Sequence, residues 1–491
     1  MDDESLLDLL VPTDILQSLF SASGSFSLEE ALQILIESSK TDNGRSNIAS
    51  RAMLPKVLQL SQSLPYPPRG QYLMLSLKLL RNLCAGEIAN QNSFIAQNGV
   101  EIVSTILQSA YPDYGITRMG LQILANICLA GEQHQEAVWD QLFPDQFIVL
   151  ARVRSCETSD PLCKVIYVCA EGSPKMIAEL CKDQGLIIVV EVIQTASAVG
   201  FREDWLKLLL SRICLEDVHF PILFPKLCEV CATEDTEDTG NSENDAFSSE
   251  QAFLLRIMSE IVNERIREIN IPNALALCIL EIFKRSIKAV DFTSRGKSCL
   301  PTGSAAIDVM GYSLTLLRDI CARESLEGFK EEGGDVVSAL LSFGLLDSLL
   351  CLLCQLEPPA LIRRALKQSE NQERTSSCPP KLCPYKGFRR DIVAVIGNCA
   401  YQRKYVQDDI REKNGILLLL QQCVADEENP FLREWGIWSV RNLLEGNEEN
   451  KRMVADLEVQ GSADVPELAE LGLKVEVDER TRRAKLVNIS S

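Results

Sequence analysis

The sequence is poor in the residues and motifs that most catalytic and metal sites need. Its 491 residues include only two histidines, His134 and His219, and neither stands beside a candidate nucleophile or an acidic cluster. It also lacks a Gly-rich phosphate-binding loop and the GxSxG and HExxH motifs. We therefore expect no catalytic residues, no cofactor and no metal, and we treat an enzyme as the least favoured class.

Long hydrophobic runs and a basic N-terminus are also missing. No segment approaches the roughly 18 successive apolar residues of a transmembrane helix. The first ten residues, MDDESLLDLL, are acidic, unlike the start of a signal peptide. We expect a cytosolic protein without membrane insertion, with the nucleus as an alternative location.

Positive charge is in deficit, because the net charge is −20. A protein that binds nucleic acid needs a basic face, so this balance argues against nucleic acid as a partner. The 18 cysteines lie mostly inside apolar helical patterns and are interpreted as reduced, buried thiols. The pairs Cys228/Cys231 and Cys351/Cys354 have zinc-like spacing, but each lacks a second pair nearby.

A helical repeat with a period of about 44 residues is present in the sequence. Asn398 and Asn442 occupy the same place in two similar apolar helices, and Asn82 and Asn126 show the same spacing. The same slot holds Tyr167, Arg212 and Asp319 in further units. Helical repeats of 40–47 residues are typical of HEAT and armadillo proteins. The sequence thus predicts an all-α, armadillo/HEAT-like right-handed α-solenoid.

The repeat pattern is interrupted at several places, which sets the predicted domain limits. We expect an N-terminal helical cap over 1–60 and armadillo-like repeats over 61–356, with an acidic insertion at 233–250. A proline-rich basic loop is expected at 357–386. The last repeats follow over 387–491, where alternation at Leu473, Val475 and Val477 predicts a small β-hairpin.

One helical stripe near the C-terminus is a candidate binding groove. Glu434, Trp438, Asn442 and Glu445 recur at helical spacing. An indole beside carboxylates suits a Lys or Arg side chain, and an Asn amide can hold an extended peptide backbone. The Trp–Asn spacing resembles that of importin-α armadillo repeats, which implies a receptor for basic peptide segments. The predicted groove comprises Asn82, Asn126, Asn398, Glu434, Trp438, Arg441, Asn442 and Glu445. In the alternative interpretation, the Asn slot bridges adjacent repeats structurally.

A basic stretch before the last repeats is the second candidate surface. Self-association is hypothesised for Lys381, Lys386, Arg389 and Arg390. The stretch could instead contact nucleic acid or anionic lipid, but it lacks a ladder of aromatic residues. An interaction with an acidic face of the same chain is the favoured alternative.

The most regular repeats resemble a known family. The segments Gly397-Asn398-Cys399, Asn414-Gly415-Ile416, Asn429-Pro430-Phe431, Glu434-Trp435 and Arg441-Asn442-Leu443 closely resemble the C-terminal domain of the ataxin-10 family over residues 387–488. The stretch from Leu79 to Ile95 also resembles that family. The resemblance implies an armadillo-like solenoid without known catalysis, a cytoplasmic interaction protein linked to cell division, signalling and cell survival.

Three functional hypotheses follow. The first is a non-enzymatic scaffold that binds other proteins through the solenoid groove. The second is a self-associating, homo-oligomeric structural subunit, and the third is an enzyme.

Overall fold

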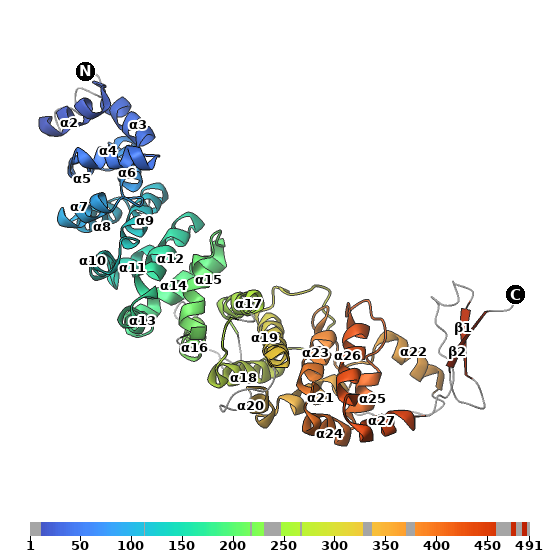
Figure 1. Ribbon diagram of the computed structural model, residues 1–491. Coiled ribbons are helices and arrows are strands. Elements are labelled where there is room, and N and C mark those ends of the chain that lie inside the picture. The colour runs from blue at the N-terminus through green and yellow to red at the C-terminus, as the bar shows by residue number, and fades with distance from the viewer. Residues whose placement is uncertain are drawn as a thin grey trace, which may run out of the picture. The chain divides into compact units, whose positions relative to one another are not determined.

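The computed structural model in Figure 1 describes residues 11–111, 113–216, 219–229, 247–265, 268–327, 336–369, 379–457, 473–477 and 484–488. The chain divides into two compact units, Met1–Thr233 and Glu234–Ser491. This division falls within the predicted acidic insertion at 233–250. Residues 233–246 of that insertion lie outside the described residues, whereas Ser249 and Glu250 already belong to a helix.

Every named element of the N-terminal unit is helical within the described residues. The elements are α2 (Thr13–Ser23), α3 (Leu28–Ser38), α4 (Asp42–Ser50), α5 (Met53–Ser63), α6 (Gly70–Leu83), α7 (Ile88–Ala96), α8 (Gly99–Ser109), α9 (Tyr114–Cys128), α10 (Glu132–Leu142), α11 (Asp145–Ala151), α12 (Cys156–Glu171), α13 (Pro174–Leu180), α14 (Asp183–Val199), α15 (Trp205–Ser211), the π-helical turn η1 (Arg212–Glu216) and α16 (Phe220–Glu229).

The longer helices of this unit pack one on the next. Helix α6 contacts α9, α9 contacts α12, and α12 contacts α15, while shorter helices lie between these partners in the sequence. On α6, Leu73, Leu77, Leu80 and Leu83 recur at helical spacing and are buried. Each such leucine contributes about 1.5–3 kcal/mol relative to an exposed one. Periodic burial of leucine therefore explains why these segments are helical and why they stack.

The C-terminal unit is also helical over most of its described length. Its helices are α17 (Ser249–Glu264), α18 (Asn273–Ala289), α19 (Ala305–Glu327), α20 (Val336–Ser342), α21 (Leu345–Gln355), α22 (Ala360–Ser369), α23 (Phe388–Ala400), α24 (Lys404–Glu412), α25 (Gly415–Leu420), α26 (Leu432–Leu444) and α27 (Glu448–Ala455). Here α19 packs on α23, and α23 packs on α26.

The contact between α23 and α26 depends on a glycine. A Cβ atom added to Gly397 would lie 2.3 Å from the Ser439 Oγ and 3.1 Å from the Ser439 Cα. The Ser439 hydroxyl donates to the main-chain carbonyl of Val393, 2.9 Å away. The two helices are therefore close enough to exchange side-chain to backbone hydrogen bonds, which a larger residue at 397 would prevent.

Two strands follow the helices. Strand β1 (Leu473–Val477) pairs antiparallel with β2 (Ala484–Asn488), so that Leu473 faces Asn488 and Val477 faces Ala484. These strands occupy the residues where the sequence alternation predicts a hairpin.

The segment predicted as a loop at 357–386 is only partly irregular, and in this respect the prediction is wrong. Residues Ala360–Ser369 form helix α22 directly after Pro358 and Pro359. Proline is tolerated at a helix start, and the following ALIRRALK is rich in good helix formers. Farther on, the main chain of Lys381 bonds to Gln355 and Glu357, which forms an isolated parallel bridge.

A candidate interaction face on helix α26

Helix α26 carries most of the residues that the sequence singles out, and it presents them on two different sides. Leu432, Gly436, Ser439 and Leu443 face the core. Glu434, Trp438, Arg441 and Glu445 are exposed, together with Ile437. Each of these exposed residues has another one three or four positions away, so they form one continuous stripe. We call Glu434, Ile437, Trp438, Arg441 and Glu445 the α26 stripe.

The centre of the α26 stripe is apolar and aromatic. Trp438 and Ile437 are each 54% exposed, which is high for residues of this size. The Arg441 guanidinium lies over the Trp438 ring at 4.8 Å from its centroid. Such a cation–π contact holds the indole in place at little cost and leaves its other face open. Aromatic residues of this kind are enriched among the residues that dominate binding energy in protein interfaces.

Asn442 lies one turn after Trp438, at the edge of α26 that faces α23, and has a structural contact. It is only 9% exposed, and its Nδ2 donates to the Gly397 carbonyl of α23, 3.0 Å away. The residue is therefore not part of the exposed stripe beside Trp438. Its donor is directed at the preceding long helix.

The other asparagines of the slot make the same kind of contact. Asn126 Nδ2 donates to the Arg81 carbonyl at 3.0 Å, and Asn398 Nδ2 donates to the Arg318 carbonyl at 3.2 Å. Asn82 Nδ2 donates to the Ile36 carbonyl and to Ser39 Oγ. We call these contacts the asparagine ladder. Each links a long helix to a main-chain carbonyl of an earlier one.

A set of glutamines completes the ladder, and sequence reasoning missed it. Gln91 Nε2 donates to the carbonyls of Cys84 and Asn126, and Gln407 Nε2 donates to those of Ala400 and Asn442. Gln135 donates to the Cys128 carbonyl. These glutamines stand nine residues after Asn82, Asn398 and Asn126, respectively. Gln91 and Gln135 are 44 residues apart, so the 44-residue repeat period is the sequence signal that identifies them.

Asp319 takes the asparagine slot in α19 and lacks the donor. It pairs with Arg318, with 2.8 Å between the charged atoms, while its buried Oδ2 has no hydrogen-bond partner. Burial raises the pKa of Asp319, and the Arg318 charge opposes this shift. A carboxylate can only accept, so it cannot replace the amide of the ladder.

The four basic residues assigned to self-association occupy different environments. Arg389 is buried within its own chain at 3% exposure, so its prediction as a surface residue is wrong. Arg390 pairs with Asp391 at 2.7 Å, and the Lys381 ammonium lies 4.7 Å from the centre of the Phe292 ring. Only Lys386 is classed as exposed among the four.

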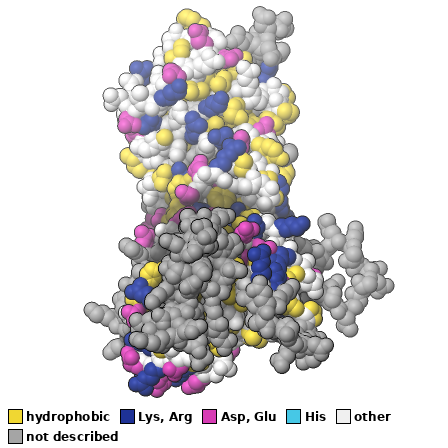
Figure 2. All heavy atoms as spheres, turned by 90° about the vertical axis from the view of Figure 1, so that its right-hand side faces the viewer, with side chains coloured by type: hydrophobic (Ala, Val, Ile, Leu, Met, Phe, Trp, Pro, Cys, Tyr) yellow, Lys and Arg dark blue, Asp and Glu magenta, His cyan; other side chains and the backbone are white. Residues whose placement is uncertain are grey.

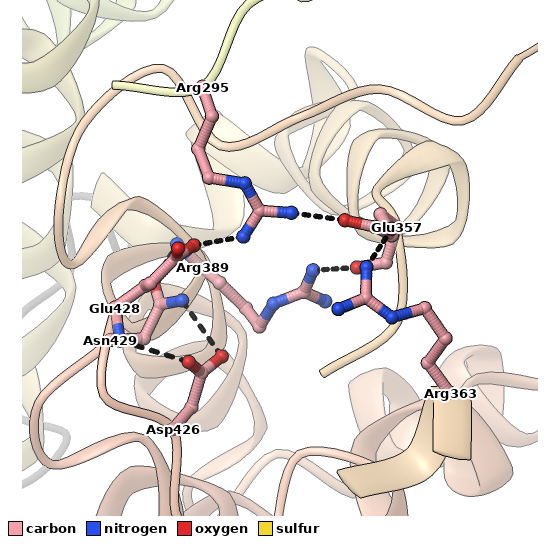
Figure 3. A network of polar contacts seen from close by, with 7 residues as sticks. All are labelled: Arg295, Glu357, Arg363, Arg389, Asp426, Glu428 and Asn429. Atoms are coloured by element: carbon pink, nitrogen blue, oxygen red, sulfur yellow. Dashed lines mark hydrogen bonds and ion pairs between the residues drawn. The ribbon is translucent and has the colours of Figure 1, made fainter. Parts of the chain in front are cut away.

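Figure 3 shows how Arg389 is held. Its guanidinium donates to the Glu357 carbonyl. It also donates to Gln422 Oε1, at 3.3 Å. The Glu357 carboxylate pairs with Arg295 and Arg363, and Arg295 also pairs with Glu428. Three loops that are distant in the sequence are thereby joined. Arg389 thus meets neutral acceptors of its own chain, whereas Arg390 of the same basic stretch pairs with the adjacent Asp391 carboxylate.

A cleft of about 670 Å³ lies beside this network, lined by Arg295, Glu357, Arg363 and residues 425–434. Arg295 and Arg363 are already paired with Glu357 and Glu428 of the same chain, which leaves little reason for a charged ligand to bind there. Among the described residues, no group of three or more His, Cys, Asp or Glu side chains is arranged to hold a metal ion.

No single helix within the described ranges is long and apolar enough to span a membrane. Helices α20 and α21 together have the length and composition of a bent span, with 62° between them.

Comparisons with known proteins agree on one family. The model described as the spinocerebellar ataxia type 10 protein domain matches residues 388–486, which include the α26 stripe. Ataxin-10 of Xenopus tropicalis is 26% identical over 423 residues, covering 81% of this chain and 77% of that protein. The ataxin-10 homolog of Dictyostelium discoideum is 42% identical over 94 residues, which are 19% of this chain and 15% of that protein.

Solved structures add little to this assignment. A crystal structure of an engineered protein covers 90% of this chain and 92% of its own, with a TM-score of 0.33 and 12% identity. The family match over the last repeats and the relatives along most of the chain lead to one conclusion: the chain is similar to the ataxin-10 family along most of its length.

Proposed function

We propose that this chain is a non-enzymatic protein-interaction scaffold, built as an armadillo-like right-handed α-solenoid, whose α26 stripe docks a partner protein. The solenoid part of the proposal rests on the successive contacts of the long helices and on the asparagine ladder that accompanies them. Stacked helical repeats of this kind expose one long surface along which partners can lie.

The main observation that supports the docking site is the exposure of Trp438 and Ile437 to solvent. A soluble protein gains nothing from keeping an indole half in water, whereas an interface gains the burial of both side chains. Glu434, Arg441 and Glu445 surround them with charge, as in the polar rim of an interface. The asparagine amides are engaged with main-chain carbonyls, which disfavours the importin-like reading of basic peptides by Trp–Asn pairs.

The experiment compares Trp438→Ala with a matched control. Phe343→Ala removes a side chain of the same unit that is 57% exposed, against 54% for Trp438. Tagged wild type and both variants are used to capture proteins from cells, with quantitative mass spectrometry. Partners that are lost with Trp438→Ala and kept with Phe343→Ala support the stripe as a docking site. Identical partner sets for all three proteins would contradict it.

Self-association through the same stripe is the second candidate. The label of the matching family model, Atx10homo_assoc, refers to homo-association, and the matched residues contain the stripe. Sedimentation equilibrium of the purified chain tests this directly. A dimer or larger species that dissociates with Trp438→Ala, but not with Phe343→Ala or Lys386→Glu, would place the contact on α26. Loss with Lys386→Glu alone would place it on the basic stretch.

A cytosolic location and roles in cell division, signalling and survival belong to the same proposal. They rest on similarity to the ataxin-10 family alone. Fluorescence microscopy of the tagged full chain through the cell cycle tests the location and the link to division together.

A further inference from the structure

Lysine and arginine side chains gather on one side of the N-terminal unit, although the whole chain carries a net charge of −20. Figure 2 shows these dark blue side chains along the upper part of the visible face. Arg81 of α6, Arg118 of α9, Lys164 of α12 and Arg202 of the turn before α15 line one hollow, and Lys78 precedes Arg81 by three residues on α6. We call these five residues the basic face.

The positive charge of the basic face is poorly neutralised. Among the described residues, no carboxylate lies within 4.0 Å of the charged groups of Lys78, Arg81, Lys164 or Arg202. Arg118 has one distant partner, Glu157, at 3.6 Å. Arg81 instead donates to the neutral oxygens of Asn82 and Gln122. Burial, and then the charge of Arg118, lower the pKa of Arg81, which is the sign of a like charge nearby.

Aromatic and acidic groups border the basic face. The Lys164 ammonium lies 5.0 Å from the centre of the Trp205 ring. Asp160 is largely buried, lines the hollow and accepts the main-chain N–H of Arg202 at 3.1 Å. Glu157 and Glu203 line the same hollow, whose volume is about 220 Å³. Acidic side chains among the cations disfavour a polyphosphate ligand, which would meet them along its whole length.

The same hollow offers hydrogen-bonding groups that suit an extended main chain. Asn126 is oriented by its bond to the Arg81 carbonyl, which leaves its Oδ1 as a free acceptor among the described residues. Gln122 accepts from Arg81 through Oε1, which leaves its Nε2 as a free donor there. A peptide in extended conformation presents both N–H and C=O groups, and this pair can meet one of each.

The spacing of the helices sets the spacing of the ligand. Packed helices lie about 8–10 Å apart, and an extended chain rises about 3.3–3.4 Å per residue. A chain that crosses α6, α9 and α12 therefore passes a new helix about every third residue. Side chains with the same charge at that interval would each meet a cation of the basic face.

We propose that the basic face binds an extended acidic segment of a partner protein, with carboxylates at about every third residue and its main chain held by Gln122 and Asn126. This deepens the proposed scaffold role by naming the chemistry of one partner. The basic face and the α26 stripe share no residues, so the two proposals are tested on different residues.

The test measures binding of a fluorescein-labelled peptide to the full-length protein by fluorescence anisotropy. The peptide carries glutamate at every third position, with serine and glycine between. Arg118→Glu with Lys164→Glu reverses two charges of the face. Lys40→Glu with Lys175→Glu is the matched control, because it changes net charge equally at side chains that are 58% and 77% exposed elsewhere on the same unit. Thermal melting checks that both variants are folded.

We expect the reversal on the face to weaken binding at least about tenfold at low salt, and the control to change it less than about twofold. Salt should weaken wild-type binding, and a peptide with the same glutamates clustered at one end should bind less well. Equal binding by the two double variants, or none by wild type, would overturn the proposal. Equally tight, Arg118-dependent binding of oligothymidylate would replace the peptide with a nucleic acid.

Two further outcomes are decisive. Peptide binding that requires neutralising the acidic residues between 234 and 246 would assign the face to the chain's own segment and overturn the proposal. The scaffold proposal is tested separately, by measuring partner capture and self-association on the Arg118→Glu/Lys164→Glu variant. If both still depend on Trp438 there, the scaffold proposal stands even when the acidic-segment proposal fails.

Discussion

The role of Asn442 separates a structural ladder from a peptide-binding groove, and one substitution can decide between them. Asn442→Ala removes the donor to the Gly397 carbonyl, in a site where the asparagine is 9% exposed. A lost hydrogen bond whose partner stays buried costs about 1–3 kcal/mol. For a unit of this size, a loss of about 2 kcal/mol lowers the melting temperature by roughly 4–8 °C.

Differential scanning calorimetry of the full chain measures this shift. Asn442→Asp should be worse than Asn442→Ala, because a carboxylate cannot donate and would be placed against a carbonyl oxygen. Trp438→Ala should change the melting temperature by less than about 2 °C, because the side chain is exposed. The reasoning is refuted if Asn442→Ala melts like wild type but loses partners as Trp438→Ala does.

Three other predictions concern packing, ionisation and reactivity. Gly397→Ala should destabilise the chain by about 1–3 kcal/mol in urea titrations because its Cβ would overlap Ser439, whereas Gly172→Ala, which meets open space, should be neutral or slightly stabilising. The pKa of Asp319 is raised in the folded state, so its carboxylate takes up a proton as the pH falls and the penalty for burying its charge is relieved. Asp319→Asn should therefore be more stable than wild type at pH 7. In the same urea titrations, this advantage should shrink towards pH 4. In the native chain, iodoacetamide should label the exposed Cys299, Cys351 and Cys354 first. The buried Cys163 should be labelled late, because burial raises its pKa to about 12. Peptide mapping by mass spectrometry measures the order, and early labelling of Cys163 would contradict the described core.

Local periodicity in the sequence predicts a good part of this fold. The 44-residue spacing of Asn82 with Asn126, and of Asn398 with Asn442, locates the long helices, because apolar side chains at helical intervals must face the neighbouring repeat. The same spacing could not say which way each asparagine points. A one-dimensional pattern places Asn442 and Trp438 on one stripe, whereas the packing of α26 on α23 turns one inward and leaves the other exposed.

Contacts between insertions could not be predicted in the same way. The pairs Arg295–Glu357 and Arg295–Glu428 join loops that interrupt the repeat, and nothing in their local sequence specifies the partner. Composition groups Arg389 with its basic neighbours because it cannot reveal burial. The prolines of 357–386 predict a loop, although two of them directly precede α22, where proline favours a helix start.

The asparagine ladder has a consequence for inherited variation. In each contact the acceptor is a main-chain carbonyl, which every amino acid supplies, and the donor is a single side chain. Substitution at Arg81, Arg318 or Gly397 can disturb the acceptor only indirectly. Substitution at Asn126, Asn398 or Asn442 abolishes the donor outright. For these hydrogen bonds, the genetic vulnerability is therefore concentrated in the asparagine codon, on the C-terminal partner of the two helices, and Gly397 adds a second sensitive codon on the N-terminal partner at the α23–α26 contact.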